Sequence, residues 1–205
     1  EGHIVEERLF AEVDGRSISG AIDLQRSEAD GTTTIMDYKC TSVWSVIHGK
    51  VEWHKQLNFY AWLAEQKEGV EVTGLQIVAV LRDWQRSKAK IETNYPLAPI
   101  VIVDVPLWSQ QERDRYVHER VKIHQDAEYE RLTGGHIPHC SDEERWKRED
   151  TFAVKKRGNK RALRVFDNMA EAETFAGGAS EREIEERLGK CVRCEDDWCR
   201  VARWC

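Results

Sequence analysis

Two aspartates and one lysine have the residue types and the spacing of a divalent-metal site. Asp37 and Lys39 are two residues apart in the predicted strand Thr33–Cys40, so their side chains point to the same side. Asp23 lies near the end of the preceding predicted strand, and pairing of the two strands around Ser27–Gly31 would bring the three side chains together. Two carboxylates, a backbone carbonyl and waters form the oxygen-rich shell that Mg²⁺ or Mn²⁺ takes. A lysine beside such an ion can activate water and stabilise charge on a phosphate.

A glutamine and a tyrosine on the next predicted element could complete this site. Gln56 and Tyr60 are four residues apart in Glu52–Gln66, a segment with helical apolar spacing, so they share one helix face. Both side chains are neutral hydrogen-bond donors, which can approach an anion without cancelling the charge of a metal ion.

The elements that must position these side chains alternate between strands and helices, which predicts an α/β core. Leu75–Leu81 is apolar nearly throughout, a pattern that favours a strand covered on both faces. The predicted strands are Leu9–Asp14, Ile18–Gln25, Thr33–Cys40, Leu75–Leu81 and Ile100–Val105, and the predicted helices are Glu52–Gln66 and Ser109–Leu132. The first two strands form a hairpin around the turn signal Gly15-Arg16.

The character of the chain changes near residue 136. After Pro138 we expect a β-hairpin around Arg157-Gly158-Asn159, a helix from Asp167 to Phe175 and a charged helix over Ser180–Leu188, followed by a cysteine-rich tail. We therefore predict two domains, an α/β core over residues 1–135 and a hairpin–helix and cysteine module over residues 136–205.

Composition and charge narrow the class of protein. The 205 residues are 40% hydrophobic and 33% charged, and no apolar run approaches the roughly 18 residues of a membrane span. The first residues have no secretion signal, so we expect a cytoplasmic protein. The net charge of −6 excludes a uniformly basic nucleic-acid coat, but Arg145–Arg164, the basic segment, holds nine Lys or Arg against two acidic residues. Such a segment favours a polyanionic partner, although a solvated hairpin remains the alternative.

Four cysteines crowd the last fifteen positions in the spacing C-x2-C-x4-C-x5-C. In a chain without a secretion signal such a cluster favours thiolate ligands for one metal ion or cluster over disulfides. The members are Cys191, Cys194, Cys199 and Cys205.

Three motifs occur in a fixed order on two predicted strands and one predicted helix. They are Gly20-Ala21-Ile22-Asp23, Ile35-Met36-Asp37-Tyr38-Lys39 and the pair Gln56 and Tyr60. In these motifs the sequence resembles the PD-(D/E)XK nuclease superfamily, and within it the RecB-like branch that includes the CRISPR-adaptation exonucleases. The resemblance extends over about residues 6–82, and the later segment is more loosely similar to phage-encoded members. It implies a restriction-endonuclease-like core, a mixed sheet flanked by helices, followed by the hairpin–helix and cysteine module.

The resemblance also implies roles for the site residues. Asp23, Asp37 and the Tyr38 carbonyl would hold Mg²⁺ or Mn²⁺, Lys39 would activate the attacking water, and the glutamine and tyrosine would position substrate or brace the site. The implied reaction is hydrolysis of DNA phosphodiester bonds, expected to be exonucleolytic, in phage or bacterial recombination or repair. The alternative is a weak or inactive nucleic-acid-binding protein that keeps the fold. Strand preference, exonuclease against endonuclease action and oligomeric state stay open.

The sequence departs from the family at its start. RecB-like members carry a metal-binding histidine on a helix before the first hairpin, whereas eight residues precede Leu9 here. His3 is poorly placed for that role, and Glu6 or Glu7 would offer a carboxylate instead. A missing helix would point to a truncated or weakened enzyme.

The same branch often holds an iron–sulfur cluster with one upstream cysteine and three near the C-terminus. The four tail cysteines suffice for a [4Fe–4S] cluster, which the spacing slightly favours, or for tetrahedral Zn²⁺. Alternatively Cys140, or less readily Cys40, is the upstream ligand, and then Cys191 is surplus.

Overall fold

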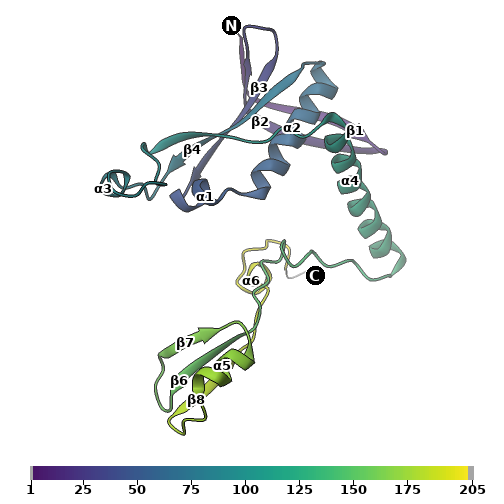
Figure 1. Cartoon of the computed structure of the whole chain (residues 1–205). Coiled ribbons are helices and arrows are strands. Elements are labelled where there is room, and N and C mark those ends of the chain that lie inside the picture. The colour runs from purple at the N-terminus through teal and green to yellow at the C-terminus, as the bar shows by residue number, and fades with distance from the viewer. Residues whose placement is uncertain (1, 203–205) are drawn as a thin grey trace. The chain divides into compact units, whose positions relative to one another are not determined.

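The computed structural model describes residues 2–202, which divide into two compact units, Glu1–Gly134 and Gly135–Cys205 (Figure 1). The first unit contains a five-stranded sheet and four helices. Its elements are β1 (His3–Val13), β2 (Arg16–Ser27), β3 (Thr33–Thr41), α1 (Val43–His48), α2 (Val51–Glu68), β4 (Val72–Leu81), α3 (Arg86–Ala89), β5 (Ile100–Asp104) and α4 (Gln110–Thr133).

The sheet of the first unit is mixed and has the strand order β1-β2-β3-β4-β5. All neighbouring strands are antiparallel except β3 and β4, whose parallel pairing is connected through α1 and α2. The β1–β2 turn lies at Asp14 and Gly15, one residue earlier than the sequence predicts, with φ of 48° and 73°. Two successive positive φ values are typical of the tight turn that matches strand twist.

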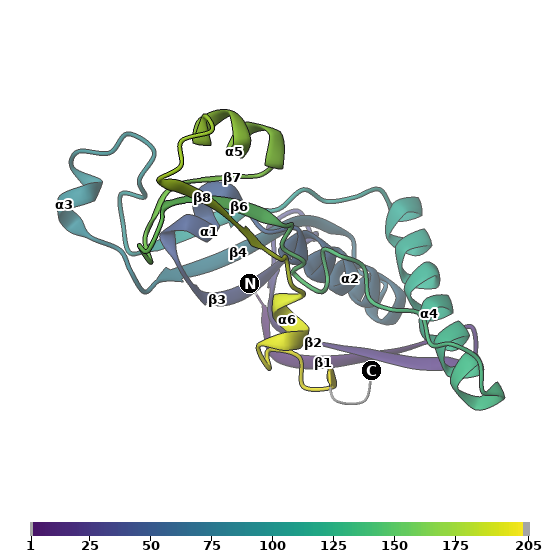
Figure 2. The same cartoon turned by 90° about the horizontal axis from the view of Figure 1, so that it is seen from below.

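Helix α2 packs across β1 to β4 and against α4 (Figures 1 and 2). Its residues Leu57, Ala61 and Ala64 have no exposed surface and form the centre of the core. Helix and sheet approach closely at Gly20, where a Cβ atom would lie 2.8 Å from both the Tyr60 ring and Leu63 Cδ1. A glycine in β2 therefore allows α2 to seat its catalytic face against the sheet.

The sequence-based expectation that β4 is covered on both faces is wrong. Ile77 and Ala79 are fully buried, but Val80 is 42% exposed, so burial alternates along the strand. In the described part of the chain α2 covers one face of the strand, and the apolar run reflects β-propensity as well as burial.

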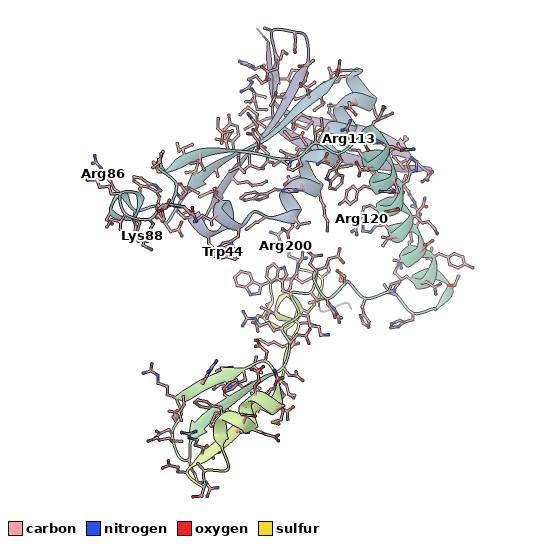
Figure 3. The ribbon with its side chains drawn as sticks, in the orientation of Figure 1. Trp44, Arg86, Lys88, Arg113, Arg120 and Arg200 are labelled. Atoms are coloured by element: carbon pink, nitrogen blue, oxygen red, sulfur yellow. The ribbon has the colours of Figure 1, made fainter. Side chains whose placement is uncertain are left out.

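Two buried polar contacts fix α4 to α2. Asn58, which is fully buried, donates to the carbonyls of His54 and Pro106 and accepts from the Trp108 amide. Arg113 (labelled in Figure 3) donates to both carboxylate oxygens of Glu65 at 2.5 and 2.6 Å. Neither these helices nor any other helix within residues 2–202 is both long and apolar enough to cross a membrane.

The second unit is built on a three-stranded antiparallel sheet of order β7-β6-β8. Its elements are β6 (Thr151–Lys156), β7 (Ala162–Phe166), α5 (Met169–Ala176), β8 (Arg182–Arg187) and α6 (Val192–Glu195). The helix predicted over Ser180–Leu188 is wrong, because these residues form β8. Pairing with β6 sets the carboxylates of Glu183 and Glu185 beside the Lys155 ammonium, and this tertiary contact overrides the helical propensity of a charged run.

Candidate active site

The site begins where the pairing between β2 and β3 ends. The ladder runs from Ser27–Thr33 to Leu24–Met36, so Asp23 and Asp37 would be the next opposed pair. Instead the Asp23 carboxylate accepts a hydrogen bond of 2.8 Å from the backbone amide of Tyr38. The two aspartates are close enough for the Asp23 charge to raise the pKa of Asp37. The structure thus brings both carboxylates to one point of the sheet.

Asp37 is buried, with 2% of its surface exposed. Burial is the main cause that raises its pKa above the ordinary value of 3.8, and the Lys39 ammonium opposes the shift. Lys39 Nζ lies 2.6 Å from Asp37 Oδ2, yet that oxygen has no hydrogen-bond partner of acceptable geometry. A buried carboxylate oxygen without a directed hydrogen bond is costly unless a cation completes its surroundings.

Gln56 and Tyr60 reach this carboxylate from α2. The Gln56 amide donates to Asp37 Oδ1 at 3.3 Å and to the Tyr60 hydroxyl at 2.8 Å. The Tyr60 hydroxyl accepts this bond, which leaves its own proton free to be donated elsewhere. These contacts orient Oδ1 of Asp37 and leave Oδ2 on the side of Lys39.

The donor set fits Mg²⁺ or Mn²⁺. The amide and the carbonyl of one residue in an extended strand point to the same edge, so the Tyr38 carbonyl lies on the edge where its amide meets Asp23. Two carboxylates and one carbonyl at one strand edge are hard oxygen ligands, which these ions prefer. Asp23, Asp37 and Tyr38 are therefore the residues that would hold the ion.

The N-terminal residues do not supply the family's helix, because residues 3–13 form β1. His3 is exposed, and Glu6 is exposed in a left-handed backbone conformation. Glu7 accepts a hydrogen bond from the buried Gln25 at 3.1 Å. The pKa of Glu68 is raised, first by burial and then by the adjacent Glu7 carboxylate. Within residues 2–202, no hydrogen bond or ion pair joins Glu7 to Asp23 or Asp37.

Four cysteines of the second unit are neighbours. Burial raises the pKa of the Cys194 thiol, and the nearby cysteines at positions 191, 199 and 140 raise it further. Cys140, Cys194 and Cys199 line one cavity of about 340 Å³ together with Arg145. Within residues 2–202, no three Cys, His, Asp or Glu side chains stand in the geometry of a metal site. The predicted ligand Cys205 lies outside the described residues, and Cys40 is exposed on β3 in the first unit.

A model of the PD-(D/E)XK nuclease superfamily matches residues 3–205. The chain belongs to the PD-(D/E)XK nuclease superfamily. As a member of this superfamily it is related to nucleases, and the expected α/β fold with a mixed sheet flanked by helices is confirmed.

Other comparisons add little to this PD-(D/E)XK assignment. No curated protein matches the sequence significantly. Among solved structures, the crystal structure of SSO0001 is similar with a TM-score of 0.39 and 14% identity, over 59% of this chain and 50% of that chain. The PD-(D/E)XK chain thus matches about half the length of that protein.

Sequence reasoning missed a groove that adjoins Gln56. Its lining includes Lys55 and Phe59 of α2 and Arg120 of α4 in addition to Gln56. No motif predicts this groove, because its residues come from distant parts of the chain. The signal that could have found it is the shared i, i+4 spacing on two helices, which places basic and aromatic residues on facing stripes.

Proposed function

We propose that this protein is a Mg²⁺- or Mn²⁺-dependent deoxyribonuclease of the RecB-like type. The observation that carries the proposal is the meeting of Asp23 and Asp37 beside Lys39 at the point where β2 and β3 separate. Superfamily membership supports a nuclease, and the order of the three motifs supports the RecB-like branch. Exonucleolytic action in phage or bacterial DNA recombination or repair, in the cytoplasm, is part of the proposal.

The side chains divide the chemistry among them. Asp23 and Asp37 hold the ion, which supplies a Lewis acid for the phosphate and lowers the pKa of bound water. Lys39 lies within 2.6 Å of Asp37, where its ammonium can orient a water and neutralise charge that develops on the phosphate. Gln56 keeps the Asp37 carboxylate in place.

The basic segment supports DNA as the partner, although fewer of its charges are available than the sequence suggests. Lys155 is engaged with Glu183 and Glu185, and Arg145 and Lys147 are engaged with Asp142. In the described chain, four residues of the β6–β7 hairpin form no ion pair and remain available to phosphates. They are Lys156, Arg157, Lys160 and Arg161.

We also propose that the cysteine module binds a [4Fe–4S] cluster or, alternatively, Zn²⁺. The mutual influence of four thiols on the pKa of Cys194 supports this, and it favours Cys140 as a member of the ligand set. Visible absorbance and metal analysis of the purified protein decide between the two metals. Cys140→Ser should lower the bound metal, whereas the matched control Cys40→Ser, in the first unit, should not. Equal metal content in both variants would remove Cys140 from the set.

A cleavage assay tests the nuclease proposal. End-labelled linear DNA and covalently closed circular DNA are incubated with the full chain in Mn²⁺, in Mg²⁺ and in EDTA. We expect metal-dependent loss of nucleotides from linear DNA, intact circles and no cleavage by Asp37→Asn, with Asp104→Asn of β5 as the matched control. Cleavage of circles would replace exonuclease by endonuclease action. Metal-independent binding of DNA without any cleavage would favour the alternative, a non-catalytic nucleic-acid-binding protein.

A further inference from the structure

A groove of about 540 Å³ runs between α2, α4 and the beginning of β2. Its position matters because Gln56, which donates to Asp37, is also one of its lining residues. The groove is therefore continuous with the proposed catalytic carboxylate. Its volume lies in the range of about 300–1,000 Å³ that small-molecule pockets occupy.

The lining combines apolar and cationic side chains. Phe59 and Tyr116 contribute aromatic rings, both half-buried, and Val117 and Val121 form a buried apolar floor. This part of the groove can accept a flat, apolar-faced group such as a nucleobase, because base–aromatic stacking does not depend on base identity.

The charges at the groove are mainly positive. Lys55 of α2 and Arg120 of α4 line it from opposite helices, and Figure 3 shows Arg120 projecting from α4. His124 lies one turn further along α4, and Glu52 is the acidic residue of the lining. Two cations beside two aromatic rings match the two parts of a nucleotide, the phosphate and the base.

The groove continues away from the active site. A smaller cavity of about 240 Å³ shares Ile18, Val121 and His124 with it and adds Arg16 from the start of β2. The path from Gln56 to Arg16 follows α4, as expected of a surface that accommodates more than one nucleotide of a strand.

We propose that this groove binds an unpaired nucleotide of the DNA strand whose phosphate reaches Asp37, with its base against Phe59 and Tyr116 and its phosphate against Lys55 and Arg120. The proposal rests on the proposed nuclease function and names its substrate as a strand with at least one unpaired base at the site. A base within a duplex is stacked and paired, so its face is not accessible to the aromatic rings.

Binding to fluorescent oligothymidylate, measured by anisotropy in EDTA with the full chain, tests the proposal separately from cleavage. Phe59→Leu keeps an apolar side chain but loses the ring, and we expect it to weaken binding about tenfold. Lys55→Gln and Arg120→Gln should each weaken binding and flatten the dependence of log K on log salt by about 0.7. The matched controls are Lys67→Gln on α2 and Arg115→Gln on α4, which lie outside this groove.

A second probe, the same oligomer with abasic sites, separates base from backbone recognition. Wild-type protein should bind it about tenfold more weakly, and Phe59→Leu should bind both oligomers equally. Equal wild-type affinity for both oligomers, equal affinity for a duplex hairpin of the same sequence, or groove variants that bind like the controls would each overturn the proposal. Groove-dependent binding by a protein that cleaves nothing in Mn²⁺ would instead overturn the nuclease function and leave the groove as a nucleotide site.

Discussion

The Asp23 carboxylate takes the place of a backbone partner for the Tyr38 amide, with 2.8 Å between Oδ2 and the nitrogen. This contact holds Asp23 across from Asp37 at the point where the β2–β3 ladder stops. One side chain therefore has two separable properties, a hydrogen-bond acceptor for β3 and a negative charge for an ion.

Substitution of Asp23 should separate these properties. Asp23→Asn keeps an oxygen that can accept from the Tyr38 amide, so we expect its urea unfolding free energy to stay within about 0.5 kcal/mol of wild type. Asp23→Ala leaves that amide without its partner and should cost about 1 kcal/mol. Both variants should lose Mn²⁺-dependent cleavage. Full cleavage by Asp23→Asn would show that the charge is not needed.

The pKa of Asp37 predicts how the metal-free protein responds to pH. Because burial raises this pKa in the folded state, the folded protein holds its proton more tightly than the unfolded chain does. Stability from this group is fully present below the ordinary value of 3.8 and is lost as pH rises through the raised value. In EDTA at neutral pH, Asp37→Asn should therefore melt at the same temperature as wild type or higher.

Adding Mn²⁺ should reverse that order, because an ion that binds the folded state raises its melting temperature. Wild type should gain stability with Mn²⁺ and Asp37→Asn should not. A thermal scan of both proteins with and without the ion measures this. A lower melting temperature for Asp37→Asn in EDTA would contradict the assignment of a strained, buried carboxylate.

Gly20 should be required by the close packing of α2. A methyl group at this position meets the Tyr60 ring and Leu63 at 2.8 Å, so Gly20→Ala must displace one of them. We expect a loss of about 1–3 kcal/mol in urea unfolding. Tyr60 also accepts from Gln56, so cleavage should fall as well. The control is Gly2→Ala, where no atom lies within 4 Å, and equal stability of the two variants would refute the packing argument.

His118 should make the attachment of the β1–β2 turn to α4 depend on pH. Its hydrogen bond with Asp14, 2.9 Å long, raises the pKa of the imidazole above 6.5. This stabilisation is fully present below about pH 6.5 and is lost as pH rises through the raised folded value. Both side chains are about half exposed, so the effect should stay below about 1 kcal/mol. Urea unfolding of His118→Gln should lack this pH dependence, and an unchanged profile would exclude the pair as its source.

The parts of the site that follow from local spacing could be predicted from the sequence. Asp37 and Lys39 share a face because of the two-residue period of a strand, and Gln56 and Tyr60 share a face because of the helical period. Asp23 approaches them because a short turn pairs β2 with β3.

The remaining features depend on contacts that no local pattern encodes. Residues 182–187 have the composition of a charged helix, but pairing with β6 makes them a strand. The contact of Glu7 with Gln25 and Glu68 joins three elements. Lys55 and Arg120 meet across one groove only because Asn58 and Arg113 attach α4 to α2.

A titration of the free protein with Mn²⁺, followed by electron paramagnetic resonance of the unbound ion, tests the central claim most directly. We predict that wild-type protein binds the ion and that Asp23→Asn and Asp37→Asn each lose this binding together with DNA cleavage, whereas Asp104→Asn keeps both. Unchanged Mn²⁺ affinity in the Asp23 and Asp37 variants would contradict the account, because the two carboxylates would then not hold the ion.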